Sequence, residues 1–165
     1  MDLLSIYLND HLAASAGGVA LARRARDSQR DRNPRLALFL DGIVEDIAAD
    51  KTELEEVIAS LGHRRDPVRQ VVAQVGERLG RLKPNGRVLR RSPLSDLVEL
   101  EALAIAVQGK RCLWRTLQQL DDRRLASVDL QRLVDRAEDQ HDRIEAQRTA
   151  IAPRAVAGHS GPVPA

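Results

Sequence analysis

The stretch AEDQHDRIEA, residues 137–146, places Glu138 and His141 about one helical turn apart. A carboxylate and an imidazole on one helix face can ligate a transition metal when facing helices supply further ligands. The same two side chains also suit a solvated helix face, or a buried hydrogen-bonded pair in which neither of them binds a metal. The chemistry of this stretch therefore depends on which helices lie opposite it.

Three other polar residues fall on helix faces that are otherwise apolar, namely His11, Asp50 and Glu101. Asp50 interrupts a stripe of apolar side chains that recur at alternating spacings of four and three residues. A metal site built from these helices would hold iron or manganese through His11, Asp50, Glu101, Glu138 and His141. The alternative is a structural polar layer, in which Asp50 pairs with His11, or Glu101 with His141, and fixes the helix register. We favour the structural layer and expect no cofactor.

Helical periodicity and turn residues divide the chain into four long helices and one short helix. Pro34 and Pro93 suit first helical turns, and Gly62 suits the position just after a helix end. Aromatic residues make up only 2% of the chain, which favours an all-α protein packed through aliphatic side chains. We expect long helices at about 2–29, 34–61, 93–120 and 127–151, a short helix at about 66–82, a bundle domain over 1–152 and a disordered tail over 153–165.

The stretches LSIYLNDHLAA, residues 4–14, and SPLSDLVELEALAIAV, residues 92–107, lie in two of these long helices. Together with the order of the helices, they resemble uncharacterised bacterial ferritin-like bundle proteins over roughly residues 1–150. The resemblance implies an all-α, ferritin-like four-helix bundle with an additional short connecting helix.

The resemblance also implies a ligand pattern for a di-iron centre, with a Glu from each of two helices and Glu-x-x-His from each of the other two. The second half of the chain matches, through Glu138 with His141 and through Glu99 or Glu101. The first half departs from the pattern, because the helix at 2–29 contains no Glu and the helix at 34–61 contains no His.

The level of each candidate along the bundle depends on the connection between the second and third long helices. In a simple up-down-up-down bundle, with a rise of about 1.5 Å per residue, His11, Asp50, Glu101 and His141 lie at one level. If the connection over 63–92 crosses the length of the bundle, Glu101 moves towards the far end from His11 and Asp50.

The middle of the chain is strongly basic. Between His63 and Ser92 there are nine basic residues against two acidic ones, and the predicted short helix carries a valine stripe opposite its arginines. This segment could lie on an anionic membrane surface or track phosphates, but it lacks the aromatic residues that anchor to interfaces or stack on bases. We favour a solvated basic face over an anionic partner. The candidate arginines are Arg64, Arg65, Arg69, Arg78, Arg81, Arg87, Arg90 and Arg91.

No sequence motif names a reaction, because the chain has no phosphate-binding glycine loop, paired Cys-x-x-Cys or Gly-x-Ser-x-Gly. The single Cys112 and the absence of a signal-peptide pattern favour the cytoplasm. We therefore expect a non-catalytic scaffold or protein-interaction module that associates with itself or with another protein and not with nucleic acid. The first alternative is an atypical or degenerate ferritin-like metal-binding protein of the di-iron carboxylate type, and the second is a peripheral binder of anionic surfaces.

Overall fold

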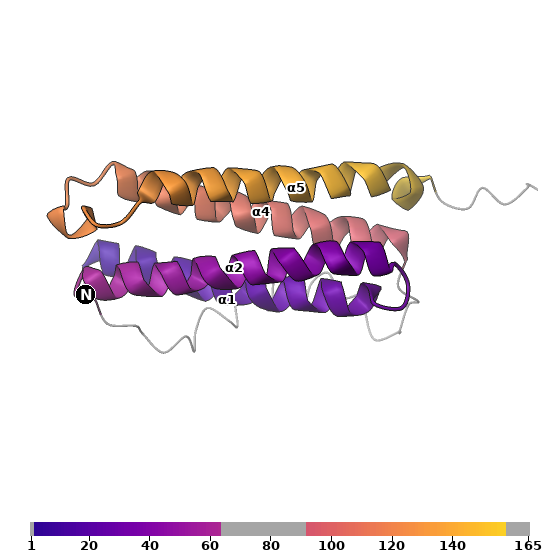
Figure 1. Cartoon of the computed structure of the whole chain (residues 1–165), viewed down its shortest axis with the longest axis horizontal. Helices are drawn as coiled ribbons and strands as arrows, with labels where there is room; N and C mark the ends of the chain where they lie inside the picture. Colours follow the sequence, from indigo (N-terminus) through magenta and orange to yellow (C-terminus); the bar gives the residue numbers. More distant parts are fainter. Residues whose placement is uncertain (1, 64–91, 158–165) are drawn as a thin grey trace, which may run out of the picture.

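The computed structural model describes residues 2–63 and 92–157, and within these ranges the chain is all-helical. The helices are α1 (Leu3–Gln29), α2 (Pro34–Ser60), α4 (Pro93–Gln118) and α5 (Leu130–Val156), with a short 3-10 helix, η1 (Arg123–Leu125), before α5. Helices α1 and α2 form one antiparallel pair and α4 and α5 form another, and the two pairs stack along their length (Figure 1). The expected short helix at 66–82 lies outside the described residues.

Local signals explain where three of the long helices begin, with a side-chain cap at α1 and α2 and a proline at α4. Asp2 accepts a hydrogen bond from Ser5 N–H at 2.7 Å, and Asn33 accepts one from Leu36 N–H at 3.2 Å. These side chains satisfy backbone donors that the first helical turn leaves without partners. The α4 helix begins with Ser92 and Pro93, where proline's fixed φ angle favours the first helical turn. The predicted starts near residues 2, 34 and 93 agree with these boundaries.

Helix α5 differs from the expected helix at both ends. It begins at Leu130 because Asp129 caps it by accepting a hydrogen bond from Arg132 N–H at 3.0 Å. It continues beyond residue 151 to Val156, with Pro153 inside its last turns. Proline removes only one backbone donor at this point, and the Ala157 N–H still bonds to the Pro153 carbonyl at 3.1 Å. Residues 153–156, expected in the tail, are therefore helical.

Contacts at the helix ends define the direction of each helix. Tyr7 near the start of α1 bonds to Thr116 near the end of α4, with 3.3 Å between the hydroxyl oxygens. At the opposite end of the bundle, Arg32 in the α1–α2 loop pairs with Asp96 at the start of α4. Helices α1 and α4 are therefore antiparallel, and the end of α2 and the start of α4 lie at opposite ends of the bundle. The order is up-down-down-up, so the connection over 64–91 joins opposite ends.

The core runs through the whole bundle and contains one large aromatic side chain, Trp114, which is fully buried. Around it the core is aliphatic, as the composition predicts. The largest fully buried aliphatic side chains are Leu8, Leu40, Ile43, Ile58, Leu61, Leu100, Leu103, Leu113, Leu117, Leu133 and Ile144. Among the described residues, no helix has the length and apolar character needed to cross a bilayer.

Substitutions at two glycines test how much local backbone conformation contributes to the stability of this bundle. Gly42 lies inside α2, and a Cβ atom added there meets no atom within 4 Å, whereas Gly62 ends α2 with a φ of +74°. We expect Gly42→Ala to stabilise the protein by about 0.5–1 kcal/mol, because alanine favours helix, and Gly62→Ala to destabilise it by about 1 kcal/mol. Urea unfolding of both variants measures these changes, and equal effects of the same sign would contradict this explanation.

Candidate functional site

The centre of the bundle holds a buried carboxylate bound by cations. Asp50 of α2 is only 3% exposed, and it pairs with Lys110 of α4 and with Arg136 of α5. Gln140 of α5 donates a hydrogen bond from Nε2 to Asp50 Oδ2 at 2.9 Å. Lys110 also donates to Gln140 Oε1, so that Lys110, Asp50 and Gln140 form a closed triangle. We call Asp50, Lys110, Arg136 and Gln140 the central polar network.

The cations of the central polar network are themselves largely removed from water. Burial lowers the pKa of Lys110 from its usual value, and the charge and hydrogen bond of Asp50 oppose part of that shift. Arg136 also lies 3.7 Å from Glu53, which pairs in turn with Arg132 at 2.8 Å. The Asp50 carboxylate is thus compensated by two basic side chains from two different helices.

The other predicted acidic ligands are also paired with arginines. Glu138 accepts hydrogen bonds from Arg111 at 3.1 Å and from Arg115 at 2.8 Å, on a partly exposed face of the bundle. Glu101 lies 3.4 Å from Arg148. These carboxylates therefore link α4 to α5 through ion pairs.

The two predicted histidines lie in different places. His11 packs edge-on against Tyr7, with ring centroids 4.7 Å apart, and lines a cavity together with Asp50. Burial lowers the pKa of His11 below its usual value, and nearby Asp10 opposes the shift. His141 borders a surface depression together with Glu101, and its Nδ1 lies 3.4 Å from Asp142.

The structure does not assemble the five candidate ligands into one site. His11 and Asp50 share the cavity, Glu101 and His141 share the depression, and Glu138 lines neither. Because α4 starts at the opposite end from the start of α1, Glu101 lies towards the far end from His11, as predicted for a connection that crosses the bundle. No group of three or more His, Cys, Asp or Glu among the described residues could hold a metal ion. These donors do not fit a di-iron centre, because each of the three acids already binds a cationic side chain.

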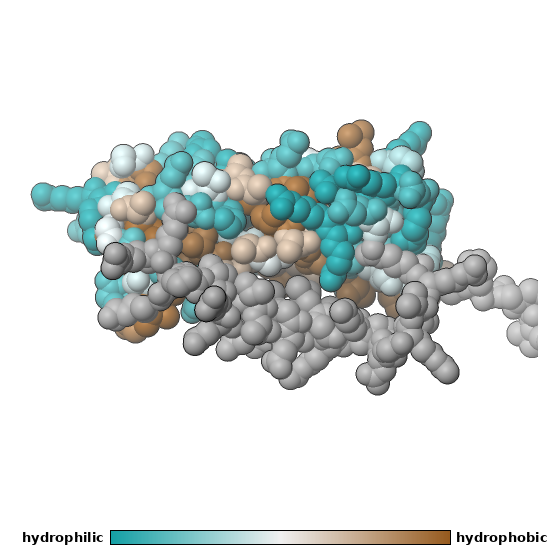
Figure 2. Space-filling view, turned by 90° about the horizontal axis from the view of Figure 1, so that it is seen from below, coloured by the Kyte–Doolittle hydropathy of each residue, from teal (hydrophilic) through white to brown (hydrophobic). Residues whose placement is uncertain are grey.

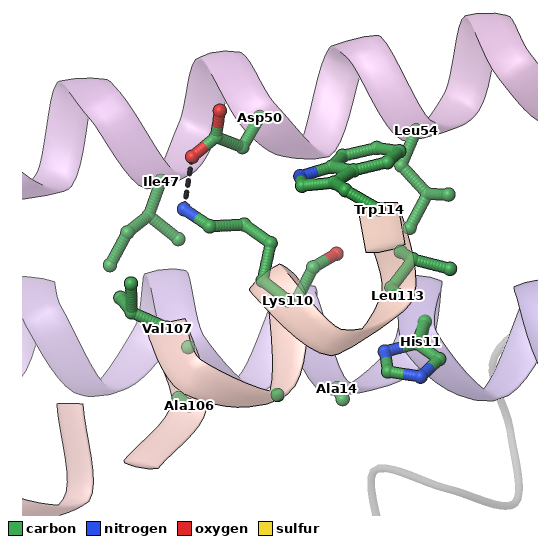
Figure 3. Close-up of a pocket in the computed structure, with 13 residues that line it drawn as sticks. His11, Ala14, Ile47, Asp50, Leu54, Ala106, Val107, Lys110, Leu113 and Trp114 are labelled. Carbon is green, nitrogen blue, oxygen red and sulfur yellow. Dashed lines mark hydrogen bonds and ion pairs between the residues drawn. The ribbon is translucent and has the colours of Figure 1, made fainter. Parts of the chain in front are cut away.

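The cavity beside the central polar network has a volume of about 170 Å³ and lies between α1, α2 and α4. Figure 3 shows Asp50 and Lys110 on one side of it and Trp114 between the helices. Most of the remaining lining is aliphatic. The aliphatic side chains of the lining are those of Ala14, Ile47, Leu54, Ala106, Val107 and Leu113.

The eight arginines proposed to bind anionic partners all lie within 64–91, outside the described residues. Sequence reasoning missed Lys110, Arg136 and Gln140, although Lys110 lies seven residues from both Leu103 and Leu117, two buried core residues. That spacing places Lys110 on the core-facing stripe of α4. Asp50 occupies the corresponding kind of position on the core-facing stripe of α2.

No protein-family model matches this chain, and no curated protein or solved structure shows significant similarity to it.

The central polar network predicts strong energetic coupling between α2 and α4. We expect Asp50→Leu to destabilise the protein by about 3 kcal/mol, because it leaves Lys110 and Arg136 without their shared carboxylate. Lys110→Met should destabilise it by a smaller amount, because Asp50 keeps its ion pair with Arg136. The double variant should lose at least about 1 kcal/mol less than the sum of the two, since the remaining aliphatic side chains contact each other. Urea unfolding of the four proteins gives the coupling. Glu138→Gln, at a partly exposed ion pair, is the control and should change stability by less than about 1 kcal/mol. Additive losses would contradict the coupling.

The lowered pKa of His11 predicts a pH dependence of stability. Between pH 6.5 and the lower pKa of the folded state, the unfolded chain binds a proton at His11 that the folded protein does not. The stability of the protein should therefore fall, relative to a His11→Gln variant, as the pH is lowered through this range. Urea unfolding of both proteins at pH 7.5 and pH 5.5 tests the sign. A constant difference, or a gain for the protein with His11 at pH 5.5, would rule the mechanism out.

Proposed function

We propose that this chain is a ferritin-like helical bundle that acts as a non-catalytic scaffold or protein-interaction module. The observation that carries the proposal is the binding of Asp50 by Lys110 and Arg136 in the core. A carboxylate can ligate a metal only through its lone pairs, and here both oxygens already face cations that the chain itself provides. The up-down-down-up order with one long connection supports the ferritin-like assignment, since ferritin-like bundles have a single long crossover.

The surface offers apolar side chains for association. Leu3 and Ile6 of α1 are 85% and 42% exposed, and Leu120, just after α4, is 38% exposed. All three lie at one end of the bundle, because the Tyr7–Thr116 hydrogen bond holds the start of α1 beside the end of α4. We call Leu3, Ile6 and Leu120 the apolar end patch. Figure 2 shows apolar residues among hydrophilic ones on the visible part of the molecule seen from below.

We further propose that the apolar end patch contacts a second copy of the chain. Exposed apolar patches often mark interaction sites. The commonest homo-oligomer is a two-fold dimer, in which the same patch of both copies forms the interface and each contact occurs twice. The metal-binding alternative has no group of three or more ligands among the described residues, and the arginines of the anionic-surface alternative lie outside them.

The oligomeric state tests this proposal. We expect the protein to form a dimer or a larger assembly in light-scattering measurements after size exclusion, and Leu3→Glu with Ile6→Glu to shift it to a monomer. Removing apolar contacts while adding like charges on both copies should weaken association at least tenfold. Leu38→Glu is the matched control, because Leu38 is 75% exposed but lies at the opposite end of the bundle.

The same samples separate the scaffold from a metal-binding protein. Elemental mass spectrometry with and without added Fe²⁺ or Mn²⁺, and on His141→Ala, should show no stoichiometric metal, and a chelator should leave the oligomer unchanged. A monomer at all concentrations would overturn the proposed self-association. Stoichiometric metal that disappears in His141→Ala would instead favour the ferritin-like metal-binding alternative.

A further inference from the structure

The cavity beside the central polar network has the features of a small-molecule site, and this goes beyond the proposed scaffold function. Its inner side consists of Ile47, Asp50 and Leu54 from α2, together with Trp114. Its outer side is bordered by small residues on α1 and α4, and two of these, Ala14 and Ala106, are exposed. The cavity therefore reaches the surface between α1 and α4 past side chains that obstruct little space.

The lining contains an indole N–H that has no acceptor among the described residues. Trp114 is fully buried, and its Nε1 has no hydrogen-bond partner among the described residues. The nitrogen edge of the ring points towards the side of the cavity that holds Asp50 and Lys110 (Figure 3). A buried donor without an acceptor is costly, so an acceptor that enters the cavity gains this interaction at little competing cost.

Charge restricts what kind of acceptor can enter. An anion would approach the buried carboxylate of Asp50, and a cation would approach Lys110, whose ammonium group lines the same cavity. A neutral oxygen avoids both repulsions and can accept from Trp114 Nε1 and from Lys110, which has three N–H donors, of which two bond to Asp50 and Gln140.

Size restricts the ligand further. An apolar protein cavity of about 150 Å³ holds a molecule such as benzene, and this cavity measures about 170 Å³. We propose that the cavity binds a small neutral carbonyl compound, with one aliphatic or aromatic ring or a short chain, whose oxygen accepts a hydrogen bond from Trp114 Nε1. The ring or chain packs against Ile47, Leu54 and Val107.

The chain provides its own reporter for this binding, because Trp114 is its only tryptophan and gives one indole N–H resonance. The experiment titrates the full-length, ¹⁵N-labelled protein with cyclohexanone and follows that resonance by NMR. We expect a saturable downfield shift of the indole proton. Methylcyclohexane has the same ring but no acceptor, so it should bind about fivefold to tenfold more weakly and produce no downfield shift.

Two variants locate the binding. Ala14→Leu with Ala106→Leu fills the outer side of the cavity from exposed helix positions, where leucine keeps a high helix propensity, and should weaken cyclohexanone binding at least tenfold. Ala20→Leu is the matched control, because Ala20 is an exposed alanine of α1 that is not part of the cavity lining, and it should leave binding unchanged.

Each result decides the proposal. A saturable downfield shift with cyclohexanone, lost in the filled variant and kept in Ala20→Leu, supports it. No saturable shift overturns it. Equal binding of methylcyclohexane, or cyclohexanone binding that persists in the filled variant, also overturns it. These results do not depend on the oligomeric state of the protein, so the cavity site and the scaffold function are tested independently.

Discussion

The buried carboxylate of Asp50 constrains the whole bundle. A charge in the core is costly unless its partners lie at hydrogen-bonding distance, and here those partners come from α4 and α5. Helix α2 belongs to one helical pair, while Lys110, Arg136 and Gln140 belong to the other. The two pairs can therefore stack only in the register that brings these four side chains to one level. Aliphatic packing alone would tolerate neighbouring registers, because leucine stripes repeat along each helix.

The two sides of the bundle are held together differently. Helices α2 and α5 are joined mainly by long charged side chains, in the pairs Arg132–Glu53, Arg136–Asp50 and Arg143–Asp46. Helices α1 and α4 make the closer backbone approach, where small residues such as Ala14 and Gly109 lie. The large ring of Trp114 fills the interior between these two arrangements, and the cavity lies where small residues leave space beside it.

The helices themselves follow from local chemistry, which is why the sequence predicts most of their boundaries. Asn33 caps the start of α2 through a hydrogen bond with Leu36 N–H, and Gly62 follows its end with a positive φ angle. Both signals are local, so the sequence predicts both boundaries correctly. Helix α5 begins at Leu130 rather than near residue 127, because Asp129 caps its first turn. The candidate site was harder to predict from the sequence, because the partner of Asp50 depends on the direction of α4. The contacts Tyr7–Thr116 and Arg32–Asp96 show that direction, whereas periodicity alone cannot distinguish the two directions.

The position of Lys110 shows how such a site could be recognised from sequence. Asp50 lies seven residues from both Ile43 and Val57, and Lys110 lies seven residues from both Leu103 and Leu117. Two opposite charges, each flanked by core residues at heptad spacing, predict a buried ion pair between facing helices more directly than a metal site. In a carboxylate metal centre, bound ions neutralise the acids of the core. Here the chain itself supplies the neutralising cations, so the charge of Asp50 can be compensated as soon as the helices pack.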